Sequence, residues 1–220
     1  MADNNAIINT DNITINTHSS IRIEGSKVLY FDPFEINRES HDADIIFVTH
    51  DHYDHFDIKS IGLITNDKTI IVAPKSMSKQ VIAKSGISED RCIFMDPEDK
   101  QQIEEVDVEA VRAYNRLKPF HMKSKGFLGY VVAMEGARYY VAGDTDFIEE
   151  MNGVRCDVAL VPVGGTYTMD KKSAAEAIAA IKPAVAIPTH YGSIAGKADD
   201  GRGFIELIST MGIKGVLKIG

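Results

Sequence analysis

Apolar and polar residues alternate in several short segments of the chain. In Asn12–Thr17 and Ser20–Glu24 every second residue is apolar, which is typical of β-strands with one buried face. Lys27–Phe31 and Ala43–Val48 contain continuous apolar runs, which predict buried strands. Similar patterns predict further strands over Thr69–Ala73, Arg91–Met95, Val106–Ala113, Gly129–Met134, Arg138–Ala142, Val158–Pro162 and Ala184–Pro188. Glu135–Ala137 is expected to turn the chain between two of them as a hairpin.

Three segments have the composition of helices. Met77–Lys84 follows Pro74 and is closed by Gly86. Ser173–Ile181 is rich in Ala and ends before Pro183, which cannot continue a helix. Phe204–Met211 is the last predicted helix. Because the strand-rich segments come with helices between the later strands, we expect two sheets packed face to face with helices outside. No linker or repeat interrupts the pattern, so residues 1–220 are predicted to form one domain.

The composition is ordinary for a globular protein. The 220 residues are 44% hydrophobic and 25% charged, and no apolar run approaches the length of a membrane span. The segment Met1–Asn5 is polar and lacks the features of a signal peptide. Cys92 and Cys156 both lie in apolar runs. They are expected to be buried free thiols of a cytoplasmic protein, with thiolate metal ligands as the alternative.

The distribution of charge limits the class of partner. The net charge is −8, and Lys and Arg form no block, which argues against binding to duplex nucleic acid. The densest basic stretch, Lys118–Lys125, allows a basic rim around a small anionic substrate. A small-molecule substrate is therefore expected, and the sequence leaves a homo-oligomer open.

The segment Thr49–His55 carries the clearest chemical signal. His50, His52, Asp54 and His55 follow a predicted strand within six residues. Neutral imidazole is the commonest protein ligand for transition metals, whereas close histidines repel one another when protonated. A solvated loop that happens to be rich in His is the alternative. The ligand number and spacing favour a metal site at the end of the strand.

Three other polar residues follow predicted strands in the same way. They are His121, Asp144 and His190. Because one edge of a sandwich collects the ends of several strands, all seven candidate ligands are expected to converge there. Five His and two Asp suit two adjacent divalent cations with an open coordination position. Zn²⁺ is the first expectation, and Mn²⁺, Fe²⁺ or Ni²⁺ would suit these ligands about as well.

Phrases along nearly the whole chain resemble the metallo-β-lactamase superfamily. They are closest to its uncharacterised metal-dependent hydrolase branch, which includes relatives of the ascorbate-6-phosphate lactonases. The phrases that carry the resemblance are His18–Ser20, Asp32–Phe34, Thr49–His55, Ala142–Asp146 and Pro188–Gly192. The resemblance implies an α/β (α+β) fold, a four-layer αββα sandwich with metals at one edge.

The resemblance also implies a division of the ligands. The first metal would be held by His50, His52 and His121, and the second by Asp54, His55 and His190. Asp144 would bridge the two. This chain departs from the superfamily in two places, since His121 stands in a Pro-Phe-His-Met setting and Phe56-Asp57 follows His55.

Several residues beyond the ligands have two interpretations. His18 is placed in a strand and is either a direct substrate contact or a hydrogen-bonded buried His. Tyr191 either donates to a developing oxyanion or packs as an aromatic residue. Asp32 either orients a ligand His or caps a turn. Gly164–Met169 is interpreted as a loop closing near the metals, with a simple turn as the alternative, and His41 as a surface residue.

The predicted chemistry is metal-assisted hydrolysis. Two cations would lower the pKa of a bridging water, which would attack an ester, a lactone or a phosphodiester. Asp54 would orient that water or accept its proton. The sequence predicts no Ser-His-Asp arrangement, because the histidines are assigned to metals. A nuclease of the same superfamily, a non-hydrolytic diiron redox protein and a metal-binding module are the alternatives.

Overall fold

The computed structural model describes residues 8–219 and contains two β-sheets. The polar segment Met1–Asn5 lies outside the described residues. Within them, the first sheet has six strands: β1 (Ile13–Ile15), β2 (Ile21–Glu24), β3 (Val28–Phe31), β4 (Ile45–Phe47), β5 (Ile70–Pro74) and β6 (Cys92–Met95). The second has seven: β7 (Lys100–Ile103), β8 (Val106–Arg112), β9 (Leu128–Met134), β10 (Ala137–Val141), β11 (Val158–Pro162), β12 (Val185–Thr189) and β13 (Lys214–Gly215).

Helices connect these strands. The α-helices of the described chain are α1 (Ile58–Ile64), α2 (Ser78–Lys84), α3 (Lys171–Ile181) and α4 (Asp200–Ser209). Short 3₁₀ helices occur at Lys75–Met77, Glu89–Arg91, Lys123–Lys125 and Glu149–Gly153. Within residues 8–219, no helix has both the length and the hydropathy that crossing a membrane requires.

Each sheet changes from antiparallel to parallel pairing along its strand order. In the first sheet β1, β2 and β3 are antiparallel, and β3 through β6 are parallel. In the second sheet β7 through β10 are antiparallel, and β10 through β13 are parallel. Parallel strands end at the same edge of a sheet, so the loops after β4, β10 and β12 can carry side chains to a common site.

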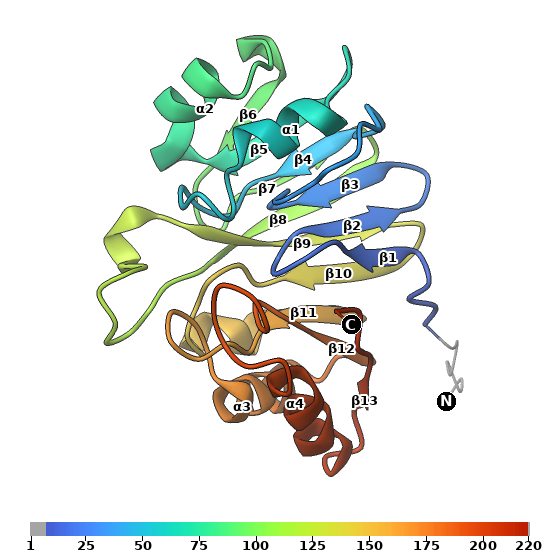
Figure 1. Cartoon of the computed structure of the whole chain (residues 1–220), viewed down its shortest axis with the longest axis vertical. Coiled ribbons are helices and arrows are strands. Elements are labelled where there is room, and N and C mark those ends of the chain that lie inside the picture. The colour runs from blue at the N-terminus through green and yellow to red at the C-terminus, as the bar shows by residue number, and fades with distance from the viewer. Residues whose placement is uncertain (1–7, 220) are drawn as a thin grey trace.

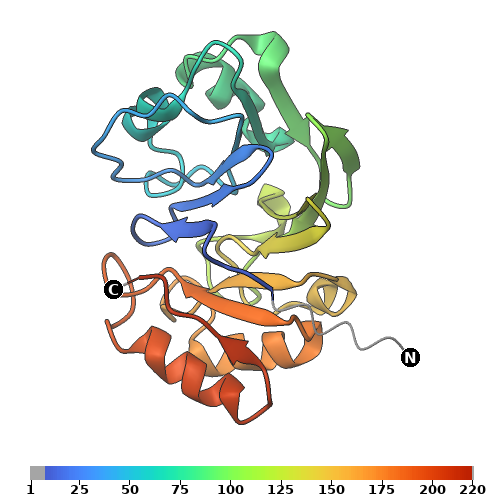
Figure 2. The ribbon, with the colours of Figure 1, turned by 90° about the vertical axis from the view of Figure 1, so that its right-hand side faces the viewer.

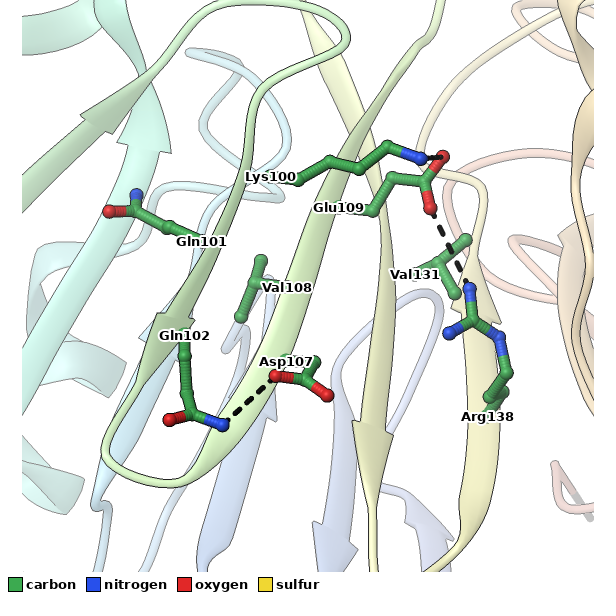
Figure 3. Close-up of a pocket in the computed structure, with 8 residues that line it drawn as sticks. All are labelled: Lys100, Gln101, Gln102, Asp107, Val108, Glu109, Val131 and Arg138. Atoms are coloured by element: carbon green, nitrogen blue, oxygen red, sulfur yellow. Dashed lines mark hydrogen bonds and ion pairs between the residues drawn. The ribbon is translucent and has the colours of Figure 1, made fainter.

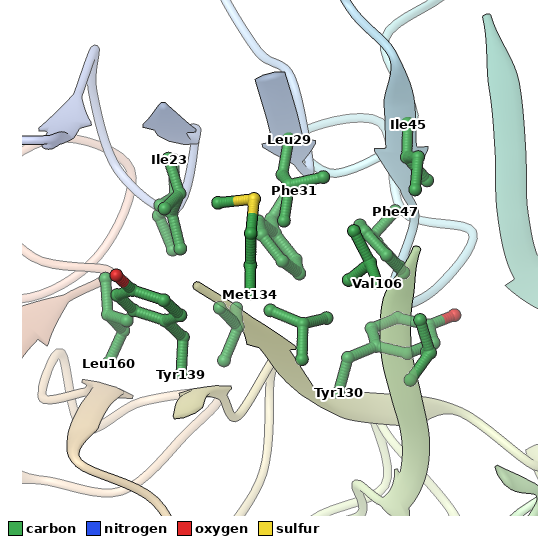
Figure 4. Packing of buried hydrophobic residues seen from close by; sticks show 14 of the residues in the cluster. Ile23, Leu29, Phe31, Ile45, Phe47, Val106, Tyr130, Met134, Tyr139 and Leu160 are labelled. Carbon is green, nitrogen blue, oxygen red and sulfur yellow. The ribbon is translucent and has the colours of Figure 1, made fainter. Parts of the chain in front are cut away.

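A hydrophobic core fills the space between the sheets. Leu29, Phe31 and Phe47 of the first sheet face Tyr130 and Met134 of the second (Figure 4). The rings of Phe31 and Phe47 stack at a centroid distance of 4.7 Å. Successive residues of a strand point to opposite faces, so every second residue of these apolar strands faces the other sheet.

The outer face of each sheet is covered by its own pair of helices (Figures 1 and 2). Ile61 and Ile64 of α1 and Val81 of α2 pack on the first sheet. Residues of α3 and α4, among them Ile178 and Phe204, pack on the second. The layers therefore run helix, sheet, sheet, helix, and the predicted αββα sandwich is confirmed. Its description as one domain stays a prediction.

Some elements differ from the sequence-based prediction. The pattern did not indicate α1, although Asp57 caps it by accepting from Lys59 N and Ser60 Oγ. It also missed β7, whose first three residues are exposed polar side chains, and the two-residue β13. His18 was placed in a strand and instead lies in the turn between β1 and β2.

The two cysteines also differ from their predicted environment. Both are free thiols, as predicted, but they are half-buried rather than buried. Cys156 lies in the loop before β11.

Candidate metal centre

The seven predicted ligands and His18 meet at one edge of the sandwich. His50, His52, Asp54 and His55 lie on the loop after β4. The others lie on loops from elsewhere in the chain: His18 between β1 and β2, His121 between β8 and β9, Asp144 after β10, and His190 after β12. The loop between β8 and β9 projects on the left of Figure 1. Six of the seven histidines are in this cluster, and the seventh, His41, is exposed as predicted.

The first group of ligand atoms comes from His50, His52 and His121. His52 Nδ1 lies 3.1 Å from His50 Nε2 and 3.1 Å from His121 Nε2. A neutral imidazole has one N–H and one lone pair, so His52 can donate to at most one of its two neighbours. The protonation of those neighbours therefore decides whether the group needs a cation.

Two polar side chains fix that protonation. Thr49 Oγ1 donates to Asp32 Oδ2 at 2.7 Å and so accepts from His50 Nδ1 at 2.9 Å. Asn115 Oδ1 accepts from His121 Nδ1 at 3.0 Å. The Nε2 atoms of both histidines are therefore left with lone pairs that point at the same place. One of these lone pairs can accept from His52 Nδ1, but a cation between the three nitrogens would satisfy both, and this is the usual orientation of metal-binding histidines.

The second group comes from His18, Asp54, His55 and His190. Asp32 Oδ2 accepts from His55 Nδ1 at 2.7 Å, so His55 Nε2 faces the cluster. His55 Nε2 is buried and has no hydrogen-bond partner in the described chain. It lies 3.7 Å from Asp54 Oδ2. Asp32 thus holds His55 directly and His50 through Thr49, which is the orienting geometry considered for it from the sequence.

Asp144 lies between the two groups. Its Oδ2 is 3.0 Å from His190 Nε2 and 3.5 Å from His121 Nε2. Its Oδ1 is 3.4 Å from His55 Nε2, and this oxygen lacks a hydrogen-bond partner in the described chain. The carboxylate therefore reaches both groups. The donor set and its unpartnered buried atoms fit divalent cations, and a third possible ligand group, His50, His55 and Asp144, overlaps the other two.

Burial and neighbouring charges separate the protonation states of the cluster. Burial lowers the pKa of His50 well below its usual value and that of His121 to about 4, with other histidines adding to the effect. Burial also opposes the charged form of His55, but Asp144 and Asp32 outweigh it and raise the pKa of His55 to about 9. In the protein without metal, burial thus favours the neutral forms of His50 and His121, whereas the two carboxylates favour the cationic form of His55.

Unusual backbone conformations place several of these side chains. His18, Asp32 and His190 have φ of 54°, 46° and 56°, in the left-handed region that non-glycine residues rarely adopt. Strain of this kind clusters at functional sites. His190 N donates to His18 O at 2.9 Å, which ties the two loops together.

His18 and Tyr191 have different surroundings. His18 is fully buried, with Nε2 at 3.2 Å from Asp54 Oδ2 and Nδ1 at 3.2 Å from Ser193 Oγ. A Ser-His-Asp series is therefore present, contrary to the sequence-based expectation. The Tyr191 hydroxyl donates to Ile219 O at 3.3 Å, and its ring packs against Gly201 of α4. This geometry fits a packed aromatic residue and gives the proposed catalytic role of Tyr191 no support.

Sequence reasoning missed three polar partners of the cluster, namely Thr49, Asn115 and Ser193. Thr49 directly precedes the His cluster, so a hydroxyl beside a ligand was a usable signal. Asn115 and Ser193 lie in loops without a local pattern, and only the fold brings them to His121 and His18.

A cavity of about 400 Å³ opens over the cluster. Its floor includes His52, Asp54, His121, Asp144 and His190, and its walls include Tyr53, Phe120, Tyr167 and Ile194. A second cavity, of about 460 Å³, lies far along the outer face of β7–β10 (Figure 3). Glu109 there forms ion pairs with Lys100 and Arg138, and Asp107 accepts a hydrogen bond from Gln102. The smaller cavity is therefore the candidate substrate site, because it lies over the candidate metal ligands.

Comparison with known proteins identifies the family of this sandwich and its cluster. A family model described as the beta-lactamase superfamily domain matches residues 12–190. A UPF0173 metal-dependent hydrolase of Thermoplasma acidophilum is 32% identical over 206 residues, which is 89% of each chain. The chain belongs to the UPF0173 metal-dependent hydrolases of this superfamily. The resemblance found in the sequence is thus confirmed, and a relation to the ascorbate-6-phosphate lactonases stays a prediction.

Solved structures agree on the fold of this hydrolase. A protein described as a metal-dependent hydrolase from Parabacteroides distasonis superposes with a TM-score of 0.77 at 27% identity, covering 94% of this chain and 93% of its own. CmlA, a diiron β-hydroxylase from Streptomyces venezuelae, has a TM-score of 0.73 at 11% identity and covers 94% and 52%. The second likeness concerns the fold alone, so the reaction must be argued from the site.

Proposed function

We propose that this hydrolase uses two divalent cations to cleave an ester, a lactone or a phosphodiester of a small molecule. The observation that carries the proposal is the direction of the Nε2 atoms of His50, His55 and His121, which hydrogen bonds to the other ring nitrogen turn toward a shared carboxylate, Asp144. His50, His52 and His121 would hold one cation, and Asp54, His55 and His190 the other.

The protein side chains would then have separate tasks. When bound, the two cations supply Lewis acidity, which lowers the pKa of a water molecule and stabilises negative charge on oxygen. Asp54 borders the cavity and would orient the attacking water or take its proton. His18 would hold Asp54 in position through its contact of 3.2 Å, with Ser193 fixing the imidazole from the other side.

The chemistry of the donors favours hydrolysis over the alternatives. Six imidazoles and two carboxylates form the cluster, whereas a diiron redox centre would need a set richer in carboxylates. A nuclease would need cations to hold a phosphate backbone, and none of the described residues that line the cavity is Lys or Arg. We also propose Zn²⁺ as the metal. We propose a location in the cytoplasm, which the free thiols of Cys92 and Cys156 support.

The proposal is tested by metal analysis and hydrolysis assays on one set of proteins. Protein purified without chelator and supplied with Zn²⁺ or Mn²⁺ should hold about two metals per chain and hydrolyse activated esters or phosphodiesters. His18→Asn should keep both metals and lose about ten-fold or more in kcat, because it only positions Asp54. His41→Asn, which alters the exposed histidine, should match the wild type.

Two results would contradict these assignments. Metal content near zero after addition of either cation would exclude the dinuclear site. Loss of one metal in His18→Asn would make His18 a ligand instead of a positioning residue.

A further inference from the structure

The cavity over the cluster has a polar floor and an apolar wall. Tyr53, Phe120, Tyr167 and Ile194 line it beside the ligands. Three of these side chains are unusually exposed for their type, with 68% of Tyr53, 45% of Phe120 and 39% of Ile194 accessible. Large apolar side chains grouped around a cavity mark a binding surface more often than isolated ones do.

The apolar wall is fixed in place. Phe120 and Tyr167 meet edge to face at a centroid distance of 4.8 Å and an angle of 86°. Asn115 Nδ2 donates to Tyr167 O at 2.9 Å, and Lys118 Nζ donates to Thr168 O. These bonds join the loop between β8 and β9 to the loop before α3. The wall is therefore largely formed before any ligand enters, which reduces the ordering cost of binding.

Two lysines near this wall are held in ion pairs. Lys118 binds Asp146 Oδ1 at 2.6 Å, and Lys123 binds Glu150 Oε1 at 2.9 Å. They are two of the three lysines of the basic stretch that allowed an anionic substrate in the sequence, and the third, Lys125, is exposed and does not line the cavity. Asp51, a carboxylate, also lines the cavity. An anionic substituent against this wall would lose its hydration without gaining a protein cation.

We infer that the wall receives a neutral, apolar acyl group, aromatic or branched, while the scissile carbonyl lies over the metal ligands. This rests on the proposed hydrolysis and adds the substrate class. The expectation of an anionic substrate, left open by the sequence, is thereby replaced by a neutral one.

The test uses 4-nitrophenyl esters and metal-loaded protein, with each rate divided by that of hydroxide-catalysed hydrolysis. Acetate, butyrate, benzoate and 4-sulfobenzoate share a leaving group and differ in the acyl part. Two additional buried methylene groups should raise kcat/KM for butyrate over acetate about ten-fold. Benzoate should gain at least as much, and the anionic 4-sulfobenzoate should lose that advantage.

Variants of the wall test whether it causes the preference for butyrate over acetate. Phe120→Ala and Tyr167→Ala should each bring the ratio of butyrate to acetate down toward one, with metal content unchanged. Leu117→Ala is the matched control, because Leu117 lies on the same loop, is 97% exposed and does not line the cavity. A second measurement uses N-methylbenzamide, a neutral unreactive amide, whose binding to the metal-loaded proteins is followed by NMR. Its affinity should fall in Phe120→Ala and Tyr167→Ala but not in Leu117→Ala.

The outcomes separate this inference from the function on which it rests. If the metal-loaded protein cleaves the esters but prefers acetate or 4-sulfobenzoate, the apolar substrate class is wrong and the hydrolase stands. If the preference is unchanged in both wall variants, the wall does not contact the acyl group. If the protein cleaves phosphodiesters but none of these esters, the acyl substrate class is wrong and the hydrolase stands. If no ester, lactone or phosphodiester is cleaved, the proposed function itself fails.

Discussion

Asp32 orients two ligand histidines of the centre without being a ligand itself. Its two oxygens accept from Thr49 N, Thr49 Oγ1 and His55 Nδ1, each at 2.7 Å. It is fully buried and has a left-handed backbone. The carboxylate therefore sets the direction of one histidine in each group, since Thr49 in turn holds His50.

Replacing this carboxylate should loosen the centre while keeping the fold. In Asp32→Asn the side chain keeps its size and tolerates the left-handed backbone, but the amide cannot serve all of its present donors. We expect metal affinity to fall about 10- to 100-fold, measured by competition with a chromogenic chelator. Asp96→Asn, at an exposed carboxylate paired with Lys75, should change nothing. Equal affinity in the two variants would mean that Asp32 does not orient the ligands.

The opposite pKa shifts of the histidines predict how stability of the metal-free protein depends on pH. His121 has its pKa lowered from 6.5 to about 4, so its contribution is complete above pH 6.5 and is lost as the pH falls toward 4. His55 has its pKa raised from 6.5 to about 9, so its contribution is complete below pH 6.5 and is lost as the pH rises through 9.

The metal-free protein should therefore be most stable near pH 6.5, which is the ordinary pKa of a histidine. Urea midpoints measured in chelator from pH 4.5 to 9.5 test this. His55→Gln should flatten the alkaline side of the profile while leaving the acid side. A profile of the variant parallel to that of the wild type would remove His55 as the source.

At the scale of elements, the loop between β11 and α3 is pressed against the end of β12. A Cβ placed on Gly164 would lie 2.2 Å from His190 O, far closer than atoms can approach. Gly164 also pairs with Asp170 as an isolated bridge, and Asp170 caps α3 by accepting from Lys172 N and Ser173 N. One glycine thus allows the helix, the loop and a ligand histidine to lie together.

Gly164→Ala should consequently destabilise the fold and disturb the centre. We expect a loss of about 1–3 kcal/mol in the free energy of unfolding and a lower metal content. Gly153→Ala is the control, because a Cβ there meets no atom within 4 Å. Denaturant unfolding and metal analysis of both variants decide the matter. Wild-type values in Gly164→Ala would show that the loop moves aside freely.

At the scale of the molecule, the ligands belong to both sheets. His50, His52 and His55 follow β4 of the first sheet, whereas Asp144 and His190 follow β10 and β12 of the second. Bound cations would therefore join the two halves of the sandwich at the edge where their loops meet. Such a link adds the binding free energy to the stability of the fold, because the unfolded chain holds no preformed site.

Removing metal should therefore lower the stability of the whole sandwich. At a free metal concentration of a thousand times Kd the gain is about 4 kcal/mol, and chelator should abolish it, as seen in the urea midpoint. In Asp144→Asn, which weakens the shared carboxylate, the effect of chelator should be much smaller. An equal effect in the variant would mean that metal binds outside this centre.

The sequence by itself determined the periodic strands, the order of ligand motifs and the αββα class. Those features depend on local alternation and on short motifs such as Thr49–His55, which are visible in one dimension. Weak local patterns were less informative. The exposed polar residues of β7 gave no alternation, and α1 is too short for a clear helical period.

Tertiary structure decided what surrounds those ligands. Asn115 is 52 residues from Tyr167, and Ser193 is 175 from His18, so no local pattern could pair them. The direction of Tyr191 away from the cluster was also set by its contact with Gly201 of α4. The use of Lys118 and Lys123 in ion pairs, which leaves an apolar wall over the ligands, depends on acidic residues of distant loops. A sequence names the groups that can bind a metal, whereas their protonation and the shape of the cavity arise from contacts that only folding makes.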